Sequence, residues 1–219
     1  MRAALFIAGL VVLAAVWLGP FPAMAPHAFF AHMTMHMGVV AVAAPLIALG
    51  IAGGRWDPVP RLQALFSPIP ASVFELIVVW AWHAPALHHY ARHSTEGLVI
   101  EQGAFFLSGL LVWLSAFGGG RAMRAARAGQ GIVGLLLTSM HMTLLGALLA
   151  LPPRPLYGHS EGFGGLSALE DQHLGGAIML LVGGVSYFLG GLWLTVLLLR
   201  ERKTADVPGV PIPADEVQP

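Results

Sequence analysis

The sequence predicts an all-α membrane protein, a polytopic bundle of about six transmembrane helices with both termini cytoplasmic. Of the 219 residues, 57% are hydrophobic and only 10% are charged, and the mean hydropathy is +0.75. A soluble domain carries about 25% charged residues. The apolar residues lie in long runs, and about 20 of them in a helix cross a hydrocarbon core of about 30 Å. In lipid the backbone must satisfy its own hydrogen bonds, which runs of this length do as helices.

Six apolar segments are expected to span the membrane, and residues that break helices separate them. Pro20 and Pro22 close the first, a connector rich in glycine and proline follows the second, and later breaks fall at three consecutive glycines and at Pro152-Pro153. The tail is charged and then rich in proline, which predicts disorder. We therefore expect one transmembrane bundle over residues 1–200 and a disordered cytoplasmic tail over residues 201–219. The six segments are residues 3–19, 29–51, 71–87, 97–117, 130–151 and 174–199.

The first segment also has the features of a secretory signal peptide. It has one basic residue, a short apolar run and the pattern Ala23-Met24-Ala25. Pro26 would follow the cleaved bond, however, and the basic region is weak. Retention as a membrane helix is the preferred interpretation, and cleavage would leave the sidedness of every later loop unchanged.

The distribution of basic residues predicts the orientation, because cytoplasmic loops accumulate lysine and arginine. With the N-terminus inside, only Arg92 and Arg154 fall on the outer side. The other nine basic residues fall on the cytoplasmic side, namely Arg2, Arg55, Arg61, Arg121, Arg124, Arg127, Arg200, Arg202 and Lys203.

Composition excludes several classes of function. The formal net charge is zero, so no global basic field favours nucleic acid. The absence of cysteine excludes disulfides, thiolate metal sites and thiol nucleophiles. No nucleophile accompanied by an oriented base is visible, and the glycines at 118–120 lack the Lys-Ser/Thr of a phosphate-binding loop. We therefore expect a protein that is not an enzyme.

The ten histidines are the most informative residues, because none falls in a predicted cytoplasmic loop. Imidazole is weakly polar and suits a membrane interface, which is a sufficient explanation for the residues in outer connections, His27, His88, His89, His93 and His159. Four others are predicted within the membrane, where an ionisable group usually faces a bundle interior or a cavity. These are His32, His36, His83 and His141. Helix packing through hydrogen bonds is the alternative to a shared polar or metal site.

Spacing favours metal binding by this set. His32 and His36 are four residues apart, so one face of a helix presents both. Neutral imidazole is a ligand for copper, zinc, iron and nickel. The run His32 to Met37 also contains Met33 and Met37, and thioether sulfur selects Cu(I). Copper is therefore the leading metal, although each methionine taken alone is better explained as a gap-filling apolar residue.

Carboxylates on the outer side add candidate ligands. Glu101 begins the fourth segment, while Glu170 and Asp171 precede the sixth beside His173. An acidic residue at a helix N-terminus can cap that helix, and it can equally ligate a metal or orient an imidazole ligand.

Several segments resemble the CtaG-like polytopic cytochrome c oxidase assembly factors of bacteria. The matching pieces occur in the family's order and cover nearly everything from the second segment to the sixth. They are AHMTMHM at 31–37, WHAPALHHYA at 82–91, FFLSGLLVW at 105–113, HMTLLGALLALPPRPLYGH at 141–159 and GLSALEDQHLGGAIM at 165–179.

The resemblance implies a bacterial inner-membrane protein that helps to build haem–copper cytochrome c oxidase, acting in copper delivery to its copper centre. It implies oxidase subunits as partners, with periplasmic copper carriers as possible donors, and a site facing the periplasm. The sequence departs from the family where Gln102 replaces a frequent histidine, where His173 replaces a frequent glutamine, and in lacking the additional N-terminal helix of longer members. The candidate metal ligands are His32, His36, His83, His141, Asp171, His173, Met33 and Met37.

Three other functions fit parts of the sequence. A haem-binding electron carrier would use two of these histidines as axial ligands. A metal-free structural chaperone of an oxidase subunit would use them for hydrogen bonds between helices. A copper transporter is disfavoured, because the cytoplasmic half of the bundle offers almost no ligands.

Overall fold

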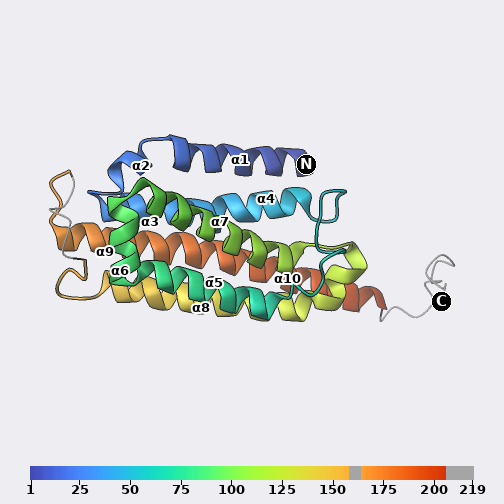
Figure 1. Ribbon diagram of the computed structural model, residues 1–219. Coiled ribbons are helices and arrows are strands. Elements are labelled where there is room, and N and C mark those ends of the chain that lie inside the picture. Colours follow the sequence, from blue (N-terminus) through green and yellow to red (C-terminus); the bar gives the residue numbers. More distant parts are fainter. Residues whose placement is uncertain (158–163, 206–219) are drawn as a thin grey trace.

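The computed structural model describes residues 1–157 and 164–205, which form an elongated bundle of helices with no β-strand in those ranges (Figure 1). Five helical stretches are long and apolar enough to cross a membrane, and a sixth spans it if one bent pair of helices counts as a single span. The predicted fold class, an all-α bundle of about six transmembrane helices, is confirmed.

The first two spans form one edge of the bundle. The second span is continuous from Phe29 to Ile51, which are the bounds that its hydropathy predicts. Its middle is π-helical, a wider turn than an α-turn that often occurs near functional sites. The elements are α1 (Arg2–Leu18), α2 (Phe21–Met24), α3 (Phe29–Met37), the π-helix η1 (Gly38–Ala43) and α4 (Ala44–Ile51).

The prediction that the third span continues to residue 87 is wrong. The helix stops at His83, and the chain turns by 70° into a second, shorter helix that begins at Pro85. Proline removes a backbone donor and disfavours a helical residue before it, and Ala84 is accordingly extended. The two helices are α5 (Pro68–His83) and α6 (Pro85–His93).

The remaining spans extend further than hydropathy predicts. Ser94 caps the fourth span by accepting a hydrogen bond from the Gly97 amide. The fifth begins at Arg121 rather than at residue 130, so the basic residues there belong to a helix and not to a loop. The elements are α7 (Thr95–Phe117), α8 (Arg121–Ala150), α9 (Ala168–Ile178), the π-helix η2 (Met179–Gly183) and α10 (Gly184–Ala205). Residues 206–219 of the predicted tail lie outside the described residues.

The bundle has two chemically different ends. We call the end holding residues 19–28, 84–94 and 151–157 the histidine end, and the end holding residues 52–67 and 118–127 the arginine end. Asp57 organises the arginine end, because its carboxylate accepts hydrogen bonds from the amides of Gly53, Val59 and Gly119. Both of these glycines have positive φ angles, 64° and 84°, which side chains rarely tolerate. In Figure 1 the histidine end is on the left, where α6 crosses the bundle.

Close approach at small residues holds α1 against α4. A Cβ atom added at Gly50 would lie 2.8 Å from backbone atoms of Phe6, and one at Gly9 would lie 3.0 Å from the carbonyl oxygen of Ala43. Close backbone approach at glycine is typical of helix packing in membranes, where van der Waals contact drives association. The first segment therefore forms an integral part of the described bundle.

Candidate metal centre

Three histidines from two spans meet inside the histidine end of the bundle. His32 and His36 lie on α3 and are both 0% exposed, and His83 is the last residue of α5. The His36 and His83 ring centroids are 5.3 Å apart, and those of His32 and His83 are 5.6 Å apart. The i, i+4 spacing on α3 therefore does place two imidazoles beside a third from another helix.

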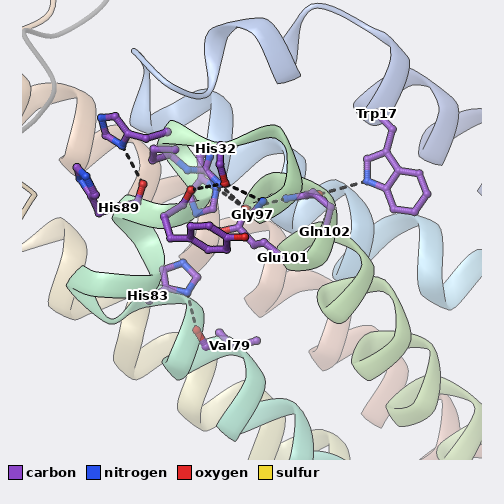
Figure 2. A network of polar contacts seen from close by, with 12 residues as sticks. Trp17, His32, Val79, His83, His89, Gly97, Glu101 and Gln102 are labelled. Atoms are coloured by element: carbon purple, nitrogen blue, oxygen red, sulfur yellow. Dashed lines mark hydrogen bonds and ion pairs between the residues drawn. The ribbon is translucent and has the colours of Figure 1, made fainter.

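Hydrogen bonding fixes the orientation of one of these rings. The Nδ1–H of His83 donates to the carbonyl oxygen of Val79, at 2.7 Å (Figure 2). This bond leaves Nε2 as the nitrogen with a lone pair, the arrangement in which outer hydrogen bonds orient histidine ligands. Nε2 is buried and has no hydrogen-bond partner among the described residues.

Four further nitrogens in the same region are also buried without a hydrogen-bond partner in the described part of the chain: both ring nitrogens of His32 and both of His36. An unsatisfied buried polar group costs about 1–3 kcal/mol, and such groups are rare enough to need an explanation, an ion-binding site being one. The donor chemistry therefore fits a metal ion that prefers nitrogen ligands.

His88 is a fourth member that the sequence did not single out. It lies on α6, is buried, and its ring centroid is 5.2 Å from that of His32. The His88 ring also stacks on the Tyr157 ring, with the two ring centroids 4.1 Å apart. The prediction assigned His88 to an outer loop because hydropathy joined residues 71–87 into one span. The Ala84-Pro85 pair was the signal that the chain turns there and carries His88 back over the bundle.

A buried ion pair lies beside the histidines. The Arg92 guanidinium of α6 donates to the Glu101 carboxylate of α7, and Nδ1 of His32 lies 3.6 Å from the same carboxylate oxygen, Oε2. Gln102 donates to Glu101 at 3.4 Å and accepts from the indole of Trp17 at 3.2 Å (Figure 2). This network links α1, α3, α6 and α7. Gln102 therefore has a structural position in this network.

Asp171 holds the helix that carries the two histidines. Its carboxylate oxygens accept hydrogen bonds from the amides of Phe29 and Phe30, at 2.7 and 2.9 Å, at the N-terminus of α3. Its own helix, α9, is capped instead by Ser167 and Glu170 in a capping box. The predicted capping role thus applies to α3 for Asp171 and to α9 for Glu170.

We expect Asp171→Asn to lower the free energy of unfolding by about 1–3 kcal/mol, because an amide group would face one buried N–H and lose its bond. The matched control is Glu170→Gln, which changes a neighbouring exposed carboxyl and should lower the stability much less. Thermal unfolding in detergent measures both. Equal melting temperatures for the two variants would contradict the assignment.

The other predicted ligands lie apart from the three-histidine group. His141 on α8 is buried, has no hydrogen-bond partner at either ring nitrogen among the residues that the structure describes, and lies near enough to His36 for an electrostatic interaction. Met33 packs towards Gly175 of α9, and the Met37 sulfur lies towards Gly183 of η2. The Nε2 of His173 bonds to the carbonyl oxygen of Pro152, at 2.9 Å. Of the eight candidates, His32, His36 and His83 come together, and His141 lies within electrostatic range.

Within residues 1–157 and 164–205, no group of three or more histidine or carboxylate side chains has the arrangement of a preformed metal site. The imidazoles are neighbours rather than a closed coordination sphere. Ring rotations are therefore required before several nitrogens could share one ion.

A small cavity lies outside the cluster at the histidine end. Its volume is about 120 Å³, and its lining includes His27, His88, His89, His93 and Tyr157. The His89 and His93 rings stack at 3.9 Å, with the His93 Nδ1–H donating to the carbonyl oxygen of His89. His27, His89 and His93 thus gather at one opening, a clustering that their outer-loop positions alone did not predict.

Tyr157 separates this cavity from the inner rings. It stacks on both Phe29 and His88, and its hydroxyl donates to the carbonyl oxygen of His83. Burial, and secondarily the Glu101 carboxylate, raise the pKa of the Tyr157 phenol well above its usual value. The hydroxyl therefore remains protonated and continues to donate this bond.

A second polar cluster, deeper in the bundle, was missed by sequence reasoning. Glu75 lies midway along α5, is 0% exposed, and accepts a hydrogen bond from the Tyr187 hydroxyl at 3.2 Å. Thr138 and Ser72 bond to each other at 2.9 Å. The expectation that the cytoplasmic half holds almost no ligands therefore overlooked this carboxyl. Glu75, Val79 and His83 follow one another at a spacing of four positions, so they lie on one face of α5.

The fold and the histidine cluster together define a multi-pass helical membrane protein whose buried histidines lie near one end of the bundle. The chain belongs to the cytochrome c oxidase caa3 assembly factor (Caa3_CtaG) family, whose model matches residues 1–201. The resemblance predicted from the sequence segments is thereby confirmed. No curated protein and no solved structure matched the chain.

Proposed function

We propose that this oxidase assembly factor binds copper in the histidine cluster and helps to deliver it to the copper centre of cytochrome c oxidase. The proposal rests on the buried imidazole nitrogens of His32, His36 and His83 that have no hydrogen-bond partner within residues 1–157 and 164–205. Because the chain belongs to an oxidase assembly family, we take an oxidase subunit as the protein that would receive the copper. Neutral imidazole is a ligand for copper as well as for zinc, iron and nickel, and the oxidase as client favours copper among these metals.

The ion pair beside His32 would limit the affinity of the cluster for a cation. Glu101 already balances Arg92, and it lies beside His32. A cation bound at His32 would compete with Arg92 for this carboxylate, which gives the site a way to bind the ion reversibly. Delivery to another protein requires such reversibility, unlike a closed structural site.

The outer cavity is the proposed route for the ion. The distribution of arginines predicts that the histidine end faces the outer, periplasmic side of the inner membrane. His27, His89 and His93 line the cavity, so an ion arriving there, from a periplasmic copper carrier or from solution, would meet imidazoles first. Tyr157 and His88 would have to shift before it reached His32.

Packing around His36 argues against the haem alternative. The Phe105 ring centroid lies 4.0 Å from that of His36, and the His83 ring centroid lies 5.3 Å from the same His36 centroid. A porphyrin between these rings would require displacement of the buried Phe105. The metal-free chaperone alternative needs histidine hydrogen bonds between helices, and within the described residues the ring nitrogens of His32 and His36 make none.

Metal content tests the proposal directly. Protein purified in detergent from copper-supplemented cells should hold about one copper per chain and show no haem absorption band, and His32→Ala/His36→Ala should lose at least about 90% of the copper. His173→Ala is the matched control, because this histidine bonds outside the cluster. Copper retained in the double variant, or haem in the wild type, would refute the proposal.

A further inference from the structure

A large apolar groove lies at the opposite end of the protein from the histidines. Its volume is about 610 Å³, and it opens between the α1–α4 edge and α10. Small-molecule sites have volumes of about 300–1,000 Å³. Its walls include Pro45, Leu46 and Leu49 from α4, Trp113 from α7 and Trp193 from α10. Nothing in the histidine cluster or its proposed route uses this groove.

Two arginines close one end of the groove. Arg2 from α1 and Arg124 from α8 both line it, and they are its only charged side chains. Both guanidinium groups approach Gly53, since a Cβ atom added there would lie 3.1 Å from Nη2 of Arg2 and 3.6 Å from Nη2 of Arg124. Two like charges from distant parts of the chain are therefore held beside one another.

Neither arginine is neutralised within the described residues, where both side-chain ion pairs involve Glu101 at the other end of the bundle. Arg2 donates only to the carbonyl oxygen of Gly53, and Nε of Arg124 is buried without a hydrogen-bond partner in that same part of the chain. Asp57 is in the same connector, but it is occupied by the amides of Gly53, Val59 and Gly119. The Asp57 carboxylate can balance at most one of the two adjacent guanidinium groups, so a net positive charge remains and favours an anion between them.

We propose that this groove binds one anionic phospholipid, with an acyl chain along the α4 and α10 walls and the phosphate between Arg2 and Arg124. A free phosphate would leave the apolar groove empty, and a neutral apolar molecule would leave the two charges unpaired, whereas a phospholipid satisfies both features at once. Basic pockets between transmembrane helices at the cytoplasmic side bind anionic lipid headgroups. The distribution of arginines predicts that this end faces the cytoplasmic leaflet.

The position of the groove gives the lipid a structural role. α1 packs on α4 and η1, whereas α10 packs mainly on α8, so the groove marks a gap that no helix fills. A lipid there contacts α1, α4, α7 and α10 together. Bound lipid would therefore stabilise the attachment of α1, whose own residues are mostly exposed.

Native mass spectrometry of the purified full chain tests this proposal. Delipidated protein is mixed with equal amounts of phosphatidylglycerol and phosphatidylethanolamine that carry the same acyl chains. We expect one retained phosphatidylglycerol per chain, preferred by at least about tenfold, and loss of that preference in Arg2→Gln/Arg124→Gln. The matched control is Arg55→Gln/Arg61→Gln, which removes the same charge from exposed residues of the same end and should leave the preference unchanged.

A groove variant separates specific binding from general attraction to the surface. Leu46→Trp fills part of the groove without changing charge, and it should also lose the retained lipid, while circular dichroism verifies its helical content. Equal retention of the two lipids, equal losses in both arginine pairs, or full retention in Leu46→Trp would each overturn the proposal. Retention of a neutral molecule such as a quinone in place of the phospholipid would do the same. Copper content is independent of this result.

Discussion

Glu101→Ala is expected to destabilise the protein by about 3–5 kcal/mol, more than any other single change to the polar network. The substitution leaves the Arg92 guanidinium buried without its carboxylate partner. A lone buried charge keeps its desolvation cost and loses its compensating attraction. It also removes the acceptor that positions Gln102, and through Gln102 the link to Trp17.

Thermal unfolding of metal-free protein in detergent measures this effect. Glu96→Ala is the control, because Glu96 lies in the same first turns of α7 but is exposed, and its loss should change stability by less than about 0.5 kcal/mol. Removal of both charges in Arg92→Leu/Glu101→Leu should recover much of the stability, since paired removal of buried ions is often neutral. If Glu101→Ala and Glu96→Ala unfold at the same temperature, the ion pair contributes nothing.

The largest functional effect is expected for His32→Ala/His36→Ala in cells that assemble the oxidase. Oxidase activity and its copper content should fall by at least about 10- to 100-fold, because among His32, His36 and His83 the two α3 imidazoles supply four of the five buried ring nitrogens without a hydrogen-bond partner in the described residues. The amount of the assembly factor in the membrane should stay the same, which separates lost function from lost folding.

His173→Gln is the matched control in those cells. It replaces a histidine at the same end of the bundle whose ring bonds the Pro152 carbonyl, so oxidase activity should remain near that of the wild type. Normal oxidase copper in the double variant would mean that delivery does not use this cluster. The metal-free chaperone would then be the better explanation, and His32→Gln/His36→Gln would be tolerated as well.

Much of the fold follows from hydropathy alone. The second span has the predicted bounds because Phe29–Ile51 is apolar throughout and ends at a glycine-rich connector. The third span was misplaced because hydropathy carries no information about backbone geometry, and Pro85 turns the chain inside an apolar run. For the same reason the burial of His88 and Arg92 was not predicted, because it depends on the turn that brings α6 over the bundle.

The site was predictable only in part. The spacing of His32 and His36 predicts that they share one helix face. Which residues pack against that face depends on which helices are neighbours, and the spacing does not predict this. Glu75 was overlooked because one carboxyl in a long apolar run looks like an isolated exception, and its bond to Tyr187 joins residues more than a hundred positions apart. Asp171 shows the same limit, since the helix that it caps is not its own.

The π-helical segments η1 and η2 interrupt two neighbouring spans halfway along their length. The widened turn of η1 leaves carbonyl oxygens for side chains from other helices, since the Trp113 indole donates to Val40 and the Ser186 hydroxyl to Ala41. One residue inserted into a regular α-helix would rotate everything beyond it by about 100°, but a π-turn can absorb the insertion locally. The two halves of each span therefore need not share one register. Natural selection could adjust the facing of the histidine-bearing half while the other half kept its packing.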